Sequence, residues 1–390
     1  MNKIFESESR IKSILDAIDN KTHQKHLNLS YAFQSLYDGY MKPVNKTIEF
    51  STSTHSLIPL ESSARIRKFI EATNTITGEN NITLTEAAQK LCDGYTDAAP
   101  LYSFGVLSDL HIQYETGLED FQRALTYLKD IVPFTCICGD LVSYASADYM
   151  AEYKECVDIY SDGMPLYECA GNHETYPGLG VSGELDIDLW ETATGKKPYY
   201  TFEYENDVFI FLSLKSEDAN DLFIDGSLEW LDTILEINND KRCFVFQHVH
   251  DPANTAADPS HAYSNILEGI SGNAFLTIIK KHPNVVWFHG HTHLTLNTKQ
   301  YPINESLGYK SIHIPSLSAV RFYNELTNSI ENSYLDENGN TIWGAISSEG
   351  YVIDVFVNKI VVRGINFAQG TNKNEVKPFE EEVYVLYTKY

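Results

Sequence analysis

Residues 285–293, VVWFHGHTH, join an apolar run to three histidines at alternate positions. The run at 285–289 is rich in β-branched and aromatic residues, which is typical of a buried strand. His291 and His293 follow it, and residues two apart in extended backbone point to the same side. The stretch therefore predicts a strand whose end delivers two imidazoles to one place.

Four other polar groups also follow apolar runs. They are SDLH with Asp109 and His111, CGDL with Asp140, AGNHE with Asn172 and His173, and FQHVH with His248 and His250. The apolar runs predict strands at 102–108, 134–138, 165–169, 208–214, 243–247 and 285–289, and the patterns between them predict helices at 119–131, 147–160, 227–237 and 272–281. Strands that alternate with helices indicate an α/β layered domain.

The polar groups are expected to meet at one edge of the sheet, because loops after strand ends build the ligand site in open α/β sheets. Gly139, Gly171 and Gly290 each precede a polar residue, and glycine there permits unusual backbone angles and close approach to a ligand. Carboxylate, amide and imidazole groups at one edge are the set that a metal centre needs. A carboxylate with two oxygens, Asp140, suits the role of a bridge between two metals.

The ordered set resembles the calcineurin-like metallophosphoesterase family, in which the blocks D-x-H, G-D, G-N-H-E, a later histidine and G-H-x-H occur in this order. All five blocks lie between Asp109 and His293. The resemblance covers roughly 101–367, including IHIPSLS at 312–318 and an expected terminal hairpin in 351–367 with its turn at Asn358–Lys359. It implies a layered β-sandwich flanked by helices.

The resemblance also implies the ligands of two metals. The first metal would take Asp109, His111 and His293, the second would take Asn172, His248 and His291, and Asp140 would bridge them. His173 would bind no metal and would lie beside the leaving group. The family's fourth block is usually a histidine followed shortly by proline, so FQHVHDP leaves two alternatives, of which His248 is favoured over His250 because it directly follows the strand.

Four imidazoles, two carboxylates and one amide oxygen suit Mn, Fe, Co or Zn better than Mg or Ca, which prefer oxygen ligands alone. The implied reaction is hydrolysis of a phosphate ester by a hydroxide that bridges the two metals, with His173 donating a proton to the leaving group. A phosphodiester is favoured and a phosphomonoester is the alternative. A metal-binding protein without turnover is disfavoured, because no ligand position of the family is missing.

Other polar residues have simpler interpretations. His289 is interpreted as a buried, hydrogen-bonded histidine, and His250 and His261 as loop residues. Tyr144, Tyr176 and Arg321 could line the site, but no pattern distinguishes them.

Composition limits the classes of partner. The formal charge of −25 disfavours nonspecific binding to nucleic acid or to anionic lipid, since phosphate binding requires Lys and Arg. None of the six cysteines forms a CxxC pair, so buried free thiols are expected rather than disulfides. No apolar run approaches the ~18 residues that span a bilayer, and the charged N-terminus lacks a signal-peptide pattern. A cytoplasmic or virion-associated location is therefore expected.

Residues 1–97 contain a tandem repeat. RIKSILDAID at 10–19 matches RIRKFIEATN at 65–74, and LSYAFQSLYDGY at 29–40 matches LTEAAQKLCDGY at 84–95 with the same spacing. Each unit, at about 5–40 and about 60–95, reads as two short helices.

The second helix of each unit would start at Ser30 or Thr85 and stop at Gly39 or Gly94. The repeats predict an attachment or assembly module, ahead of a phosphoesterase domain at 98–390. They loosely resemble attachment segments of phage tail proteins. A further alternative is therefore a virion or surface protein whose esterase domain degrades glycerophosphate wall polymers or is structural.

Overall fold

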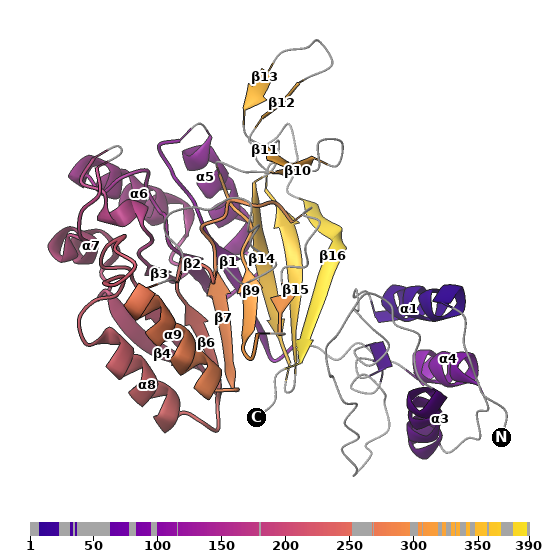
Figure 1. Ribbon diagram of the computed structural model, residues 1–390. Helices are drawn as coiled ribbons and strands as arrows, with labels where there is room; N and C mark the ends of the chain where they lie inside the picture. The colour runs from indigo at the N-terminus through magenta and orange to yellow at the C-terminus, as the bar shows by residue number, and fades with distance from the viewer. Residues whose placement is uncertain are drawn as a thin grey trace. The chain divides into compact units, whose positions relative to one another are not determined.

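The protein is described by a computed structural model with defined elements in an α/β arrangement (Figure 1). The structure describes residues 8–22, 32–33, 36, 63–77, 83–94, 100–114, 116–178, 181–251, 267, 269–296, 303–305, 307–318, 322–324, 329–331, 333–335, 341–343, 348–356, 359–367 and 377–387. The chain divides into two compact units: Met1–Leu101, Val355–Val362 and Glu381–Tyr387 form one, and Tyr102–Asp354, Arg363–Glu380 and Thr388–Tyr390 form the other. The domain boundary predicted between residues 97 and 98 stays a prediction.

Two six-stranded sheets form the framework (Figure 1). The first has the order β16-β15-β14-β1-β2-β3, with β1 (Tyr102–Leu107), β2 (Thr135–Cys138), β3 (Leu166–Cys169), β14 (Glu349–Val355), β15 (Lys359–Asn366) and β16 (Lys377–Tyr387). The second has the order β4-β5-β6-β7-β9-β8, with β4 (Tyr199–Tyr204), β5 (Asp207–Leu212), β6 (Arg242–Phe246), β7 (Val285–His289), β8 (Ile303–Asn304) and β9 (Lys310–His313).

The strands that lead to the predicted site run parallel in both sheets. β1 pairs with β2 and β2 with β3, and in the second sheet β5, β6, β7 and β9 pair in turn, all in parallel. Parallel strands end at the same edge of their sheet, so the loops after them can share one site. Two short hairpins, β10 (Phe322–Asn324) with β11 (Ser329–Glu331) and β12 (Ser333–Leu335) with β13 (Thr341–Trp343), lie outside the two sheets.

Aromatic side chains fill the space between the sheets. The Phe104 ring of β1 lies 5.1 Å from Phe209 of β5, 5.3 Å from Phe244 of β6 and 6.3 Å from Phe288 of β7, measured between ring centroids. These rings are fully buried and tilted or edge-on to one another, which is the arrangement that aromatic quadrupoles favour. The edge that carries the site therefore rests on a rigid core.

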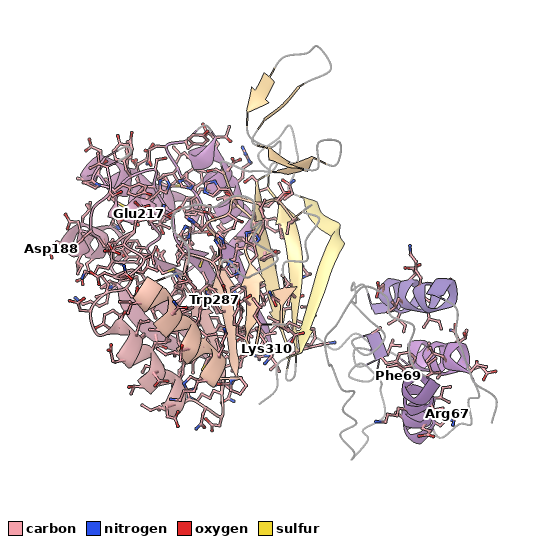
Figure 2. All side chains as sticks on the ribbon, viewed as in Figure 1. Arg67, Phe69, Asp188, Glu217, Trp287 and Lys310 are labelled. Carbon is pink, nitrogen blue, oxygen red and sulfur yellow. The ribbon has the colours of Figure 1, made fainter. Side chains whose placement is uncertain are left out.

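Helices cover the outer faces. α5 (Gly117–Leu128), α6 (Ala147–Tyr160) and α7 (Ile187–Thr194) pack on the first sheet through one apolar cluster that includes Phe121, Met150 and Trp190. α8 (Ser227–Ile237) and α9 (Gly269–Lys281) pack on the second sheet through another cluster around the fully buried Trp287 (Figure 2). The predicted β-sandwich flanked by helices is confirmed.

The described part of residues 1–97 is mainly helical. α1 (Glu8–Thr22), α3 (Ser63–Thr77), α4 (Leu84–Gly94) and helical residues at 32–33 and 36 share one apolar cluster, in which the Phe33 and Phe69 rings stack at 4.8 Å. The predicted cap at Thr85 is wrong. Thr83 caps α4, because Thr83 Oγ1 accepts from Glu86 N at 3.2 Å and Glu86 Oε2 accepts from Thr83 N at 3.0 Å. Ser30, Gly39 and the proposed assembly role lie outside what the structure describes.

The strands and helices predicted between residues 102 and 289 are all present, most with ends shifted by one to three residues. α5 ends at Leu128 rather than at 131, since Pro133 follows closely and residues before proline disfavour the helical conformation. The predicted hairpin strands in 351–367 are β14 and β15, and Asn358 of the predicted turn lies outside the described residues. The pattern analysis missed α7, β4, β8, β9, the four strands of the two short hairpins and β16.

The side chains of five of the six cysteines are described, and all five are buried and free, as expected. Among the helices that the structure describes, none is both long enough and apolar enough to cross a membrane.

Glu168 is a buried carboxyl group on β3. Its Oε1 accepts a hydrogen bond from the Tyr153 hydroxyl at 2.6 Å, and its Oε2 has no hydrogen-bond partner in the described part of the chain. Burial raises the pKa of Glu168 above its ordinary value, although the Tyr153 bond and Lys196 oppose the rise. The folded protein therefore favours the neutral form of this group.

Replacing Glu168 with glutamine is expected to remove a contribution to stability that declines as pH rises. A carboxyl group whose pKa is raised by folding contributes stability that is fully present below its unfolded pKa, and this stability is lost as pH rises through the folded pKa. Relative to the variant, the free energy of unfolding of the wild type should fall between about pH 4 and about pH 8. Urea unfolding at both pH values measures the difference, and a difference that is flat or rises with pH contradicts the prediction.

Candidate metal centre

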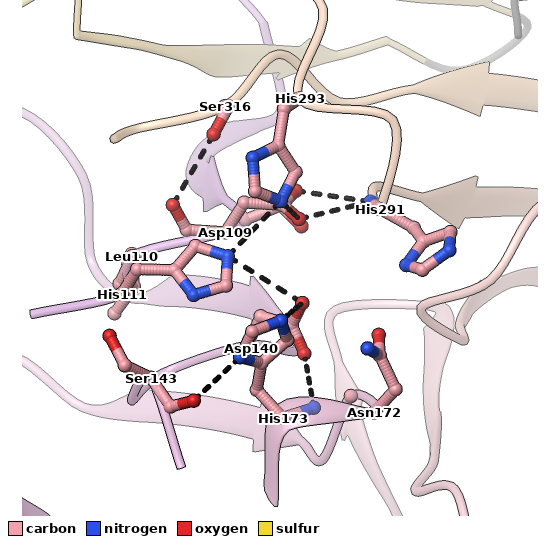
Figure 3. A network of polar contacts seen from close by, with 12 residues as sticks. Asp109, Leu110, His111, Asp140, Ser143, Asn172, His173, His291, His293 and Ser316 are labelled. Atoms are coloured by element: carbon pink, nitrogen blue, oxygen red, sulfur yellow. Dashed lines mark hydrogen bonds and ion pairs between the residues drawn. The ribbon is translucent and has the colours of Figure 1, made fainter. Parts of the chain in front are cut away.

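The predicted polar groups lie together at one edge of the two sheets. Five strands, β1, β2, β3, β6 and β7, end at this edge, and the loops that follow them carry the cluster. Its members are Asp109, His111, Asp140, Asn172, His173, His248, His291 and His293, and all of them except His248 are labelled in Figure 3. The structure therefore brings these predicted residues together, and their roles as metal ligands or proton donor stay a prediction.

Two groups of side chains could each hold a metal ion. Within each group the potential ligand atoms all lie within 4.8 Å of one another: Asp109, His111, Asp140 and His293 form the first group, and Asp140, His248 and His291 form the second. Asp140 is the one side chain common to both groups. Its Oδ2 lies 3.0 Å from His248 Nε2 and 3.6 Å from His111 Nε2, so it faces both groups at once.

Asn172 adds an amide oxygen beside these groups. Its side chain points into the space between Asp140 and His291 (Figure 3). Asn172 Oδ1 is buried, and it accepts no hydrogen bond from the residues that the structure describes. An unpaired buried acceptor is costly, and a cation at this place would satisfy it. The donor set therefore fits a metal.

The backbone at the site is left-handed rather than extended. The φ angles are 54° at Asp109, 41° at His111, 54° at Asp140, 72° at His291 and 59° at His293. These residues form most of the non-glycine residues with positive φ in the described chain, and such strain concentrates at functional sites. His291 and His293 therefore do not share a side through extended backbone, contrary to the sequence prediction, and Asp109 and His111, which are also two apart, have the same left-handed geometry. Each pair reaches the cluster through a tight left-handed turn.

Close packing at the strand ends requires glycine. A Cβ at Gly139, where φ is +85°, would lie 2.5 Å from His248 Nδ1, and a Cβ at Gly290 would lie 2.5 Å from Asp109 Oδ2. Neither distance is possible without displacement of a cluster side chain. The glycines that precede Asp140 and His291 are therefore needed for close approach, as predicted.

Backbone hydrogen bonds hold the loop that carries Asp109. Leu110 N and His111 N donate to Asp140 O at 2.8 and 3.1 Å, and Ser318 N donates to Asp109 O at 3.1 Å. His291 N donates to both oxygens of Asp109, at 3.2 and 3.1 Å. Asp109 and Asp140 thus join loops that belong to both sheets. The segment 312–318 supports the loop of Asp109 through the bond from Ser318 N.

The family model of calcineurin-like phosphoesterases matches residues 102–294. The chain carries a calcineurin-like phosphoesterase domain. The matched span contains every member of the cluster, from Asp109 to His293. This match supports metal-dependent hydrolysis of phosphate esters as the activity of the domain.

Solved structures with a similar chain path include a predicted phosphoesterase from Streptococcus pneumoniae TIGR4, with 10% identity over 71% of this chain and 97% of that chain and a TM-score of 0.32. Vacuolar protein sorting 29 from Cryptosporidium parvum has 12% identity over 73% and 98%, with a TM-score of 0.32. Vps29 from Entamoeba histolytica, solved with Zn²⁺, has 9% identity over 74% and 99%, with a TM-score of 0.28. None of the curated proteins compared with the chain matches it.

The carboxylates of the phosphoesterase domain are held ionised. Burial alone would raise the pKa of Asp140, but His248, His173 and His111 outweigh it and hold the pKa well below its ordinary value. The pKa of Asp109 is also lowered, because His293 and His248 outweigh the effect of burial. Both groups are therefore charged and ready to bind a cation.

The imidazoles differ in charge. Burial and neighbouring histidines hold the pKa of His111 and of His291 well below the ordinary value, so both rings are neutral, as metal ligands must be. At His248 burial acts in the same direction, but Asp140 and Asp109 outweigh it and raise the pKa to about 10. Metal binding at His248 would therefore release a proton.

His173 is the most open of the clustered histidines. Its side chain is 28% exposed, against 4% for His111 and 13% for His293. Its Nδ1 lies 2.7 Å from Ser143 O, which can only accept, so Nδ1 carries the proton of that bond. Nε2 lies 4.0 Å from Asp140 Oδ2 and is left for proton exchange with a bound molecule.

Between the two alternatives for the fourth block, His248 is the one that lies against Asp140. The His250 ring lies beside the His291 ring, with centroids 5.7 Å apart, and is outside both ligand groups. His289 is buried, as predicted, with its ring 4.9 Å from Trp287. His261 and Arg321 lie outside the described residues.

Sequence reasoning missed Glu174 as an organiser of the loops. Its Oε2 accepts from Asp140 N at 3.0 Å and from Gly171 N at 2.7 Å, and its Oε1 accepts from Val142 N at 3.1 Å. Three backbone donors from two loops thus converge on one buried carboxyl group. The signal was present, because Glu174 is the last residue of the AGNHE block.

Proposed function

We propose that the protein hydrolyses phosphate esters, with a preference for phosphodiesters, by means of two metal ions. The observation that carries the proposal is the pair of ligand groups that share Asp140. A shared carboxylate between two close groups is the arrangement of two-metal hydrolases. The family supports phosphoester hydrolysis, and the number of metals and the preference for diesters are part of the proposal.

The proposed ligands follow from the geometry of the two groups. Asp109, His111 and His293 would hold one ion, Asn172, His248 and His291 would hold the other, and Asp140 would contact both. When bound, two such ions supply a hydroxide nucleophile at neutral pH and polarise the phosphoryl oxygens. The mixture of imidazole and oxygen donors favours Mn, Fe, Co or Zn.

The protein's own groups perform the remaining tasks. The buried side chains of the cluster exclude bulk water, which strengthens electrostatic interactions within the site. His173, fixed through Nδ1 by Ser143 O, presents Nε2 at the open side of the site, where it can give a proton to the departing alkoxide. Glu174 fixes the loops of Asp140 and Asn172 relative to each other by accepting backbone hydrogen bonds from both.

The proposal predicts turnover that depends on metal and is faster for diesters. Chelation of the purified protein should abolish hydrolysis of bis-p-nitrophenyl phosphate, and Mn²⁺ should restore it, because the hydroxide nucleophile depends on the metal. With Mn²⁺, kcat/KM should be higher for bis-p-nitrophenyl phosphate than for p-nitrophenyl phosphate. Equal or faster turnover of the monoester would make the protein a phosphomonoesterase, and turnover that persists after chelation would contradict metal dependence.

A further inference from the structure

A line of hydrogen bonds runs outward from the Asn172 side chain. Asn172 Nδ2 donates to the Tyr176 hydroxyl at 3.0 Å, and this hydroxyl donates to Glu217 Oε1. Glu217 Oε2 accepts from Ser182 Oγ at 2.8 Å. Tyr176 and Glu217 are 41 residues apart in the sequence, and Glu217, labelled in Figure 2, lies in the segment between β5 and α8. These hydrogen bonds therefore connect the loop that carries Asn172 to the segment that follows β5 of the second sheet.

The number of protons fixes the direction of each bond. A tyrosine hydroxyl has one proton and a carboxylate has none, so the proton of Tyr176 points to Glu217. Burial raises the pKa of Tyr176, and the bond to Glu217 raises it further, so the hydroxyl keeps its proton. The Tyr176 oxygen then remains as an acceptor, and in the Asn172 amide only the NH₂ group can donate to it.

This arrangement selects one of the two orientations of the Asn172 amide. With Nδ2 bound to Tyr176, Oδ1 faces the other way, toward the space that it shares with Asp140 and His291 (Figure 3). A metal ion binds the amide oxygen and is repelled by the NH₂ group. Rotation of the amide by half a turn would therefore remove a ligand, and the bond to Tyr176 opposes that rotation.

We infer that Tyr176 and Glu217 are positioning residues that hold the Asn172 oxygen toward the second metal site. The inference rests on the proposed function, because it takes Asn172 as a metal ligand. Partners that orient a ligand in this way commonly change metal affinity by about 10–100-fold when they are removed. The Asn172 side chain points into the space between Asp140 and His291 (Figure 3), and His291 belongs to the second group alone, so the effect should fall on that one site.

The direct test is metal binding by a Tyr176→Phe variant. Phenylalanine keeps the ring that packs 4.9 Å from His173 and removes only the hydroxyl. In titration calorimetry of the full chain with Mn²⁺, we expect two binding events in the wild type and, in the variant, one event weakened by about 10–100-fold with the other unchanged. Tyr149→Phe is the matched control, because its hydroxyl bonds to Tyr144 and not to Asn172.

A second variant keeps the inference testable if Tyr176→Phe does not fold. Glu217→Gln preserves the size of the side chain but can present NH₂ instead of oxygen to Tyr176, so it should weaken the same single site by a smaller factor. Unchanged affinities at both sites in these variants would overturn the inference, and so would equal weakening of both sites, which indicates a general structural role. A wild type that binds fewer than two Mn²⁺ ions would instead refute the proposed function itself.

Discussion

Replacing Asp140 with asparagine is expected to lower kcat/KM for a phosphodiester by at least about 10³-fold. Asp140 is the one side chain found in both ligand groups, and its carboxylate is held ionised by His248, His173 and His111. The variant keeps the size of the side chain but loses its charge and one acceptor oxygen. Both metals should therefore bind more weakly, and the transition-state stabilisation of several kcal/mol that metals provide should be lost.

The measurement combines turnover with metal content. We expect the purified Asp140→Asn variant to hold less than the wild-type amount of Mn²⁺ after dialysis and to show the same loss of kcat/KM with every phosphodiester. Asp354→Asn is a matched control, because Asp354 pairs with Arg363 and lies in neither ligand group. A variant at Asp140 that retained metal and full turnover would show that Asp140 is not a shared ligand.

The order of the strand ends made the site predictable from the sequence. Each of the five polar blocks directly follows an apolar run, and parallel strands bring such blocks to one edge whatever the length of the segments between them. Residues as distant as Asp109 and His291 could thus be assigned to one site, and His291 N does contact Asp109 in the structure. The apolar character of 285–289 predicted β7 with its observed bounds.

The path of the backbone inside the site was not predictable by the same reasoning. The spacing of Asp109 and His111, two residues apart after a strand, is typical of extended backbone, yet both residues have positive φ. The left-handed turns depend on bonds from distant segments, such as Ser318 N to Asp109 O, and these bonds leave no mark in the local sequence. Tertiary contacts therefore overruled the local preference, as they commonly do at functional sites.

The same limit applies to the residues that orient the ligands. Nothing in the sequence links Tyr176 to Glu217, because the two belong to different segments and meet only when the sheets pack. Glu174 differs, since it lies in the same block as Asn172. It accepts hydrogen bonds from backbone N–H groups of two loops of the cluster. Local blocks thus reveal the residues of the candidate metal centre, whereas the partners that orient these residues require the fold.

Replacement of His173 by asparagine is expected to slow hydrolysis by an amount that depends on the leaving group. A positioned proton donor is commonly worth about 10²–10⁴-fold, and its value is greatest when the departing oxygen is strongly basic. An alkyl diester releases a basic alkoxide, so the loss should approach this range. A p-nitrophenyl diester releases a stable phenolate that needs little protonation, so the loss should be much smaller.

Metal content distinguishes this role from that of a ligand. His173 belongs to neither ligand group, so the variant should bind two Mn²⁺ ions with wild-type affinity while kcat for the alkyl diester falls. The open position of the ring and the bond from Nδ1 to Ser143 O leave Nε2 as the group that meets the leaving oxygen. An equal loss for alkyl and p-nitrophenyl diesters would mean that His173 stabilises the phosphoryl group rather than the departing alkoxide, because only proton donation makes the loss follow leaving-group basicity.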